Sequence, residues 1–182
     1  MGTRQKSGEE MALENETPEQ FDLRHLLLKK DPQKYVDTMT THIDKNPQDR
    51  RAYFARHQGW NRLGHPEKAI GDLDAAIALG AHPVYHLSRG QILAKLGRHH
   101  EALQDYATAE AMTSPSEWVD CWGPLHQACS YAYLGHSQEA LAACSRLKED
   151  HWTPGLDGAP GGNKQEVIAE IRQRLASAKK GS

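Results

Sequence analysis

The feature that most constrains this chain is a short segment that occurs three times along it. In each occurrence Leu-Gly is followed five residues later by Ala and then by an aliphatic residue, at 63–70, 96–103 and 134–141. The glycines Gly64, Gly97 and Gly135 are 33 and 38 residues apart. Glycine commonly follows the last turn of a helix, so each copy predicts the end of one helix, a tight turn and the start of the next. The chain is therefore predicted to be a series of helical hairpins.

A stripe of small and large residues follows each of these turns. The stripes have the spacing i, i+4, i+7, which places their members on one face of a helix. They comprise Ala69, Leu73 and Ala76, then Ala102, Tyr106 and Ala109, then Ala140, Cys144 and Leu147. Each second helix is thus expected to bury one narrow face.

This pattern resembles the tetratricopeptide repeat (TPR) family, whose unit is a pair of helices of about 34 residues. The small site of the first helix is occupied by Gly90 and Ala128 in the second and third copies. The large site three residues further on holds Trp60, Leu93 and Tyr131. The first copy departs from the family pattern, with His57 at the small site, and the third has about four extra residues around 114–122. The resemblance implies an all-α, right-handed α-solenoid of helix-turn-helix repeats with capping helices.

The expected organisation follows from this register. Residues 1–16 are a polar leader, and a degenerate repeat at about 17–49 precedes the clear copies at 50–82, 83–115 and 117–151. A Gly/Pro loop at 152–162 leads to a C-terminal capping helix at 163–180. That helix has its apolar stripe at Val167, Ile168, Ile171, Leu175 and Ala178.

Composition agrees with stacked helices. The chain has 22 alanines, and its Leu, Ile, Val and Phe together number only 30 of 182 residues. Small residues let neighbouring helices approach closely, and alanine has the highest helix propensity. The net charge of -2 argues against nucleic acid as a partner, and no apolar run is long enough to span a membrane. There is no secretory signal, and the three cysteines (Cys121, Cys129 and Cys144) indicate reduced thiols in a cytoplasmic protein.

An arginine and an aspartate recur sixteen residues apart in two copies. Arg56 and Asp72 form the first pair, and Arg89 and Asp105 form the second. The third copy lacks both charges, with Gln127 and Ala143 at the equivalent positions. We predict that each pair is an ion pair that joins the two helices of its hairpin. We assign a further structural role to the turn glycines and to Ala69, Ala102 and Ala140.

Eleven histidines require metal binding and catalysis to be considered. The sequence has no Cys-x-x-Cys, His-Glu-x-x-His or acidic calcium loop, so no metal or other cofactor is predicted. His126 and Cys129 could share a helical face, but nothing supplies an oxyanion hole, and a structural thiol is the simpler interpretation. We therefore predict no enzymatic activity. Trp118 and Trp122 are expected to pack in one long helix of the third copy.

In TPR proteins the first helices line a concave surface that holds a peptide of a partner. That resemblance implies a groove lined by Arg51, Phe54, Gln58, Arg62, Val84, Ser88, Gln91, Lys95, Trp122, His126, Cys129 and Tyr133. The Lys and Asn clamp of TPR domains that bind chaperone tails is absent from the equivalent positions. The expected function is a protein–protein interaction scaffold that binds an extended or helical peptide.

Three alternatives remain open at this point. One is a small TPR chaperone of a bacterial secretion system, and another is a metal-dependent regulator that uses the His and Cys residues. The third is a homo-oligomer formed through the repeat surface. The sequence also leaves open whether the C-terminal helix occupies the groove.

Overall fold

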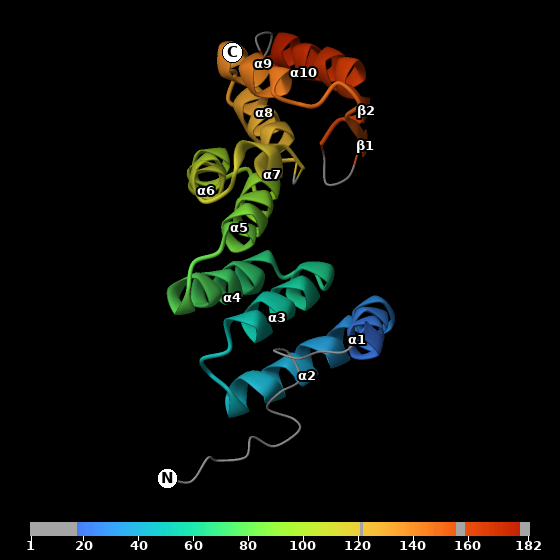
Figure 1. The fold of residues 1–182 in the computed structure, drawn as a ribbon, viewed down its shortest axis with the longest axis vertical. Helices are drawn as coiled ribbons and strands as arrows, with labels where there is room; N and C mark the ends of the chain where they lie inside the picture. Colours follow the sequence, from blue (N-terminus) through green and yellow to red (C-terminus); the bar gives the residue numbers. More distant parts are fainter. Residues whose placement is uncertain (1–17, 121, 156–158, 179–182) are drawn as a thin grey trace. The chain divides into compact units, whose positions relative to one another are not determined.

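The computed structural model describes residues 18–120, 122–155 and 159–178, so the predicted leader at 1–16 and Cys121 lie outside the described residues. The described part consists of helices and one small sheet (Figure 1). The helices are α1 (Pro18–Lys30), α2 (Pro32–Lys45), α3 (Arg50–Arg62), α4 (Pro66–Leu79), α5 (Pro83–Lys95), α6 (His99–Ala111), α7 (Pro115–Asp120), α8 (Gly123–Tyr133), α9 (Ser137–Ser145) and α10 (Lys164–Ala178). The strands are β1 (Trp152–Pro154) and β2 (Gly161–Asn163). The all-α repeat fold predicted from the sequence is confirmed.

The helices belong to two compact units. The first extends to Ala81 and contains α1–α4, and the second begins at His82 and contains α5–α10. Within the first unit, α1 packs on α2, α2 on α3, and α3 on α4. Within the second, the α5–α6 and α8–α9 hairpins pack against each other through α6 and α8, and α10 packs on both α8 and α9.

The three Leu-Gly turns have the same geometry. Gly64, Gly97 and Gly135 have φ of 76°, 77° and 76°, in the left-handed region that favours glycine. Each turn closes with the pair of backbone hydrogen bonds of a Schellman motif. The longer-range bonds, each 2.9 Å, run from the N–H groups of His65, Arg98 and His136 to the carbonyls of Trp60, Leu93 and Tyr131. The repeated sequence signature is therefore the signature of this helix cap.

Helix starts are also fixed locally. Proline occupies the first turn of α2, α4, α5 and α8, where its missing N–H costs no hydrogen bond. The carboxylates of Asp31 and Asp49 cap α2 and α3 by accepting hydrogen bonds from backbone N–H groups, each at 2.9 Å. His82 caps α5 in the same way, at 3.3 Å from the N–H of Val84.

Close helix approach depends on glycine and alanine at the interfaces. A Cβ on Gly90 would lie 2.5 Å from Cε1 of Tyr106, so α5 and α6 can meet at this distance only because position 90 has no side chain. Ala69, Ala102 and Ala140 are fully buried at the start of the second helix of their hairpins. The chain has few large aliphatic residues because small residues occupy many of the contacts between its closely packed helices.

Both predicted ion pairs are present. Arg56 donates to Asp72 through Nη2 at 2.7 Å and through Nε at 3.0 Å, and Arg89 contacts Asp105 through the same atoms at 2.7 and 2.8 Å. The two aspartates are about 5% exposed. His86 adds a third contact to Asp105, with Nδ1 at 3.0 Å from Oδ1. Each pair joins the two helices of one hairpin.

The third hairpin has a different polar contact at the equivalent position. Gln127 donates to Glu110 of α6 at 2.8 Å and accepts from Arg146, just after α9, at 3.3 Å. Arg146 also pairs directly with Glu110. Gln127 therefore joins the third hairpin to the second through Glu110 and contacts the end of α9 through Arg146, whereas Arg89 and Asp105 join helices within the second hairpin.

Two sequence predictions are wrong in this part of the chain. Trp118 and Trp122 do not share a long helix, because α7 ends at Asp120 and Trp122 has a left-handed φ of 59°. Pro124, in the first turn of α8, explains the break, since it lacks the N–H that a continuous helix would donate and its ring would clash with the carbonyl four residues earlier, at the end of α7. The segment 152–162, predicted as a loop, contains β1 and the first two residues of β2, and the two strands pair antiparallel with Thr153 opposite Gly162.

Candidate binding groove

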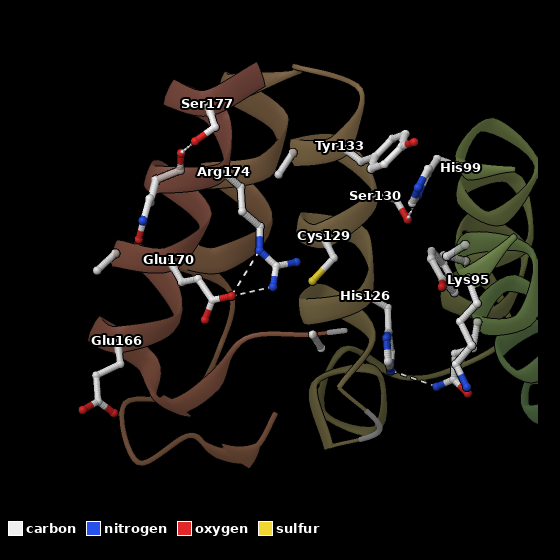
Figure 2. Close-up of a pocket in the computed structure, with 17 residues that line it drawn as sticks. Lys95, His99, His126, Cys129, Ser130, Tyr133, Glu166, Glu170, Arg174 and Ser177 are labelled. Carbon is white, nitrogen blue, oxygen red and sulfur yellow. Dashed lines mark hydrogen bonds and ion pairs between the residues drawn. The ribbon is translucent and has the colours of Figure 1, made fainter. Parts of the chain in front are cut away.

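A groove of about 1130 Å³ opens in the second unit, between α5 and α6 on one side and α10 on the other, with α8 as its floor (Figure 2). The α5–α6 side contributes Gln91, Ala94, Lys95, His99 and Tyr106. The floor contributes His126, Cys129, Ser130, Ala132 and Tyr133, and the α10 side contributes Glu166, Ala169, Glu170, Gln173, Arg174 and Ser177, with Ala159 at one end.

The structure brings five of the predicted groove residues together. Gln91, Lys95, His126, Cys129 and Tyr133 all line this groove. Val84 and Ser88 lie on α5 but outside the lining, and Trp122 lies at the start of α8, also outside it. The residues proposed from the first copy, which are Arg51, Phe54, Gln58 and Arg62, lie on α3 in the other unit.

Sequence reasoning missed the wall that α10 provides. It predicted α10 as a cap, from its apolar stripe, and left open whether this helix occupies the groove; Val167 and Ile171 are fully buried against α8 and α9. The groove side is the adjacent polar stripe, with Glu166, Glu170, Gln173 and Ser177 at successive helical turns. This spacing is visible in the sequence, but it does not show whether a capping helix lies inside a groove or forms one of its walls.

Hydrogen bonds between neighbouring side chains organise the floor and both walls. The amide of Gln91 on α5 donates to Nε2 of His126 on α8 at 2.8 Å, which requires His126 to be unprotonated at that nitrogen. Ser130 Oγ is hydrogen-bonded to Nδ1 of His99 at 3.3 Å. On α10, Nε of Arg174 donates to Glu170 at 3.2 Å. The side chains around the groove are thus held in place before any ligand binds.

Aromatic rings lie on two levels of the groove. Tyr133 is 67% exposed and stacks on the buried His99, with ring centroids 3.9 Å apart and planes 29° apart. Tyr106 is buried beneath His126 at 5.9 Å between centroids. Burial lowers the pKa of His99, with a smaller contribution from His100, which favours the neutral ring. One face of the Tyr133 ring therefore packs on His99, and its other face is exposed to solvent.

The thiol in the groove is not an activated nucleophile. Burial raises the pKa of Cys129 to about 12, although the nearby Arg174 acts in the opposite direction. A cysteine nucleophile needs a lowered pKa, so the pairing of Cys129 with His126 lacks the electrostatics for thiolate chemistry. Within the described residues there is also no group of three His, Cys, Asp or Glu side chains placed to hold a metal ion. No helix among those residues is long and apolar enough to cross a membrane.

Comparison with known proteins supports the fold. No family model matches the chain, and no curated protein sequence matches it significantly. Among solved structures, TTC0263, a thermophilic TPR protein in Thermus thermophilus, is 22% identical with a TM-score of 0.59, over 93% of this chain and 85% of that one. The MamA protein is 15% identical with a TM-score of 0.61, over 75% and 74% of the two chains. A MamA RS-1 ArsTM double mutant is 13% identical with a TM-score of 0.64, over 88% and 93%. The chain thus has the fold of tetratricopeptide repeat proteins, as its sequence pattern indicated.

Proposed function

We propose that this protein is a non-catalytic scaffold that binds a segment of a partner protein in the groove between α5, α6, α8 and α10. The observation that carries the proposal is the exposed ring of Tyr133, which stacks on His99 inside the groove. Hydrogen bonds between neighbouring side chains hold much of the rest of the lining in place. Aromatic residues exposed inside a concave site are typical anchors of protein–protein interfaces. Because these side chains are ordered before binding, less conformational entropy is lost when a ligand binds.

The test is an affinity purification with three forms of the full chain. The wild type is compared with a His126→Ala/Tyr133→Ala variant and with Trp152→Ala. Trp152 is a matched control because it is 65% exposed, close to the 67% of Tyr133, but does not line the groove. We expect partners retained by the wild type and by Trp152→Ala to be depleted at least tenfold on the groove variant. Partners retained equally by all three forms would refute the proposal.

The metal-dependent alternative has its own test. A thermal-shift titration with zinc, together with a measurement of bound metal, is expected to show no stoichiometric metal and no specific stabilisation. One metal ion bound per chain would replace the scaffold proposal with a metal-dependent one.

A further inference from the structure

We infer that the occupant of this groove is an amphipathic α-helix of about three turns from a partner protein, with a basic flank toward α10 and an acidic flank toward Lys95. The inference rests on the proposed function and goes beyond it by specifying the conformation and charge of the ligand. It follows from the length and width of the groove, from its hydrogen bonds and from the charges on its two walls.

The dimensions of the groove match a helix. The α10 wall extends from Glu166 to Ser177, which corresponds to about 16 Å at 1.5 Å per residue. A volume of about 1130 Å³ over this length gives a mean width of roughly 9 Å. This width is close to the 10–12 Å diameter of a helix and about twice the 4.8 Å spacing between strands. An extended peptide of the same length would have only about five residues and would leave much of the groove empty.

The hydrogen bonds of the groove also favour a helix. An extended peptide needs partners for its backbone N–H and C=O groups, whereas a helix satisfies most of these groups internally. The polar side chains of the groove are largely occupied with each other: Gln91 with His126, Ser130 with His99, and Glu170 with Arg174. Glu166 accepts from the N–H of Asn163 at 2.8 Å, and Ser177 donates to the carbonyl of Gln173 at 3.0 Å. The backbone N–H and C=O groups of an extended peptide would lose their hydrogen bonds to water in the groove. To replace them, the peptide would have to compete with the existing hydrogen bonds between side chains.

Small side chains allow a helix to approach the floor and both walls. Ala94, Ala132 and Ala169 line the α5, α8 and α10 sides, and Ala159 lines one end. Helices approach most closely where the contact residues are small. Tyr133 then serves as the anchor against which an apolar side chain of the ligand packs.

The two walls carry opposite net charge. On α10, Glu166 and Glu170 face the groove with one compensating guanidinium, from Arg174. On the α5–α6 wall, Lys95 supplies a positive charge, and the lowered pKa of His99 favours its uncharged ring. Complementary charges fix the register and direction of a ligand more than they add affinity. A helix with basic residues on one flank and acidic residues on the other places each flank beside the wall of opposite charge in only one of its two N-to-C orientations.

The test is a selection of random 16-residue peptides displayed on phage, with the full chain as the target. Peptides that also bind the His126→Ala/Tyr133→Ala variant are removed, and Trp152→Ala serves as the control that should retain binding. We expect the enriched sequences to have apolar residues at i, i+3 or i+4, and i+7, with basic and acidic residues on opposite flanks. A synthetic enriched peptide should become helical on binding, by circular dichroism, and a proline at its centre should weaken binding more than tenfold.

A charge-reversal experiment tests the flanks. Lys95→Glu should weaken an enriched peptide at least fivefold, and a peptide whose acidic flank is changed to lysine should recover that loss. Groove-dependent peptides that tolerate a central proline, or that show no change with Lys95→Glu, would overturn this inference and leave the scaffold proposal standing. If no enriched peptide depends on His126 and Tyr133, the scaffold proposal itself fails.

Discussion

The second and third hairpins have the same kind of Leu-Gly turn, but different interactions hold their two helices together. The α5–α6 hairpin has the buried pair of Arg89 and Asp105 between its helices. At the same positions the α8–α9 hairpin has Gln127, which contacts the preceding hairpin, and the buried Ala143. The third hairpin instead shares a core with α10, to which Val167, Ile171 and Leu175 contribute.

This difference shows that the Leu-Gly turn defines the hairpin, whereas the contact between its helices can be supplied in more than one way. An internal ion pair holds a hairpin without help from its neighbours. A hairpin that relies on an apolar face needs another helix to cover that face. The helix that covers α8 and α9 also forms one wall of the groove, so the third hairpin and the candidate binding site both depend on α10.

The largest effect is expected from Ile171→Ala in α10. Ile171 is fully buried in the core shared with α8 and α9, and such a truncation costs about 3 to 4 kcal/mol of unfolding free energy through lost burial and a residual cavity. Hydrogen exchange should accelerate in α8, α9 and α10 more than in α3 and α4. Exchange that rises equally in every hairpin would contradict the dependence of the third hairpin on α10.

Asp105→Ala is expected to destabilise the second hairpin by about 3 kcal/mol, because it leaves Arg89 and His86 without their shared carboxylate. This value is at the low end for a buried pair, since the side chain of Arg89 is 24% exposed and water can solvate part of it. Denaturant unfolding of Asp105→Ala, of Arg89→Ala and of the double variant Arg89→Ala/Asp105→Ala gives the coupling energy between the two charges. A coupling near zero would show that the two charges act independently.

Acidification should destabilise the first hairpin through His57. His57 occupies the small site that holds Gly90 in the second copy, and burial lowers its pKa to about 4. The unfolded chain, with an ordinary histidine pKa near 6.5, binds this proton more readily, so stability is lost as pH falls from 6.5 toward 4. We expect His57→Gln to lose about 2 kcal/mol less stability than the wild type between pH 7 and pH 5, with a remaining loss from groups such as His99, whose pKa burial also lowers. Equal pH dependence of the two proteins would exclude His57 as the source.

Gln127→Ala should have the smallest effect, below about 1 kcal/mol. Its partners Glu110 and Arg146 are 34% and 41% exposed, so they retain water and each other when the amide is removed. The measurement is the same denaturant unfolding as for Asp105→Ala. A cost as large as that of Asp105→Ala would show that the polar contacts of Gln127 stabilise the protein as much as the ion pair of the second hairpin does.

The sequence predicted the parts of the fold that local chemistry determines. The Leu-Gly turns and the Arg–Asp spacing each depend on residues within one hairpin, so a repeat alignment was enough to find them. The break at Trp122 was also encoded locally, by Gly123 and Pro124, but the helical spacing of the two tryptophans concealed it. The strands β1 and β2 pair across a segment rich in Gly and Pro, a composition that indicated only a loop.

The candidate site was predictable only in part. Five lining residues came from the first-helix positions of the second and third copies, because the resemblance assigns those positions to one surface. The α10 wall and the stack of His99 on Tyr133 depend on how separate helices pack. No spacing within one helix reports such contacts, so Glu166, Glu170 and Gln173 were found only in the structure.

The central claim is that the groove bordered by α5, α6, α8 and α10 is the binding site. The most direct test is a backbone NMR titration of the full chain with a peptide from the selection described above. We predict that the shifted amides cluster at Gln91, His126, Tyr133 and Gln173, and that the shifts disappear in the His126→Ala/Tyr133→Ala variant. Shifts that cluster around Trp152, or on α3 and α4, would contradict the account.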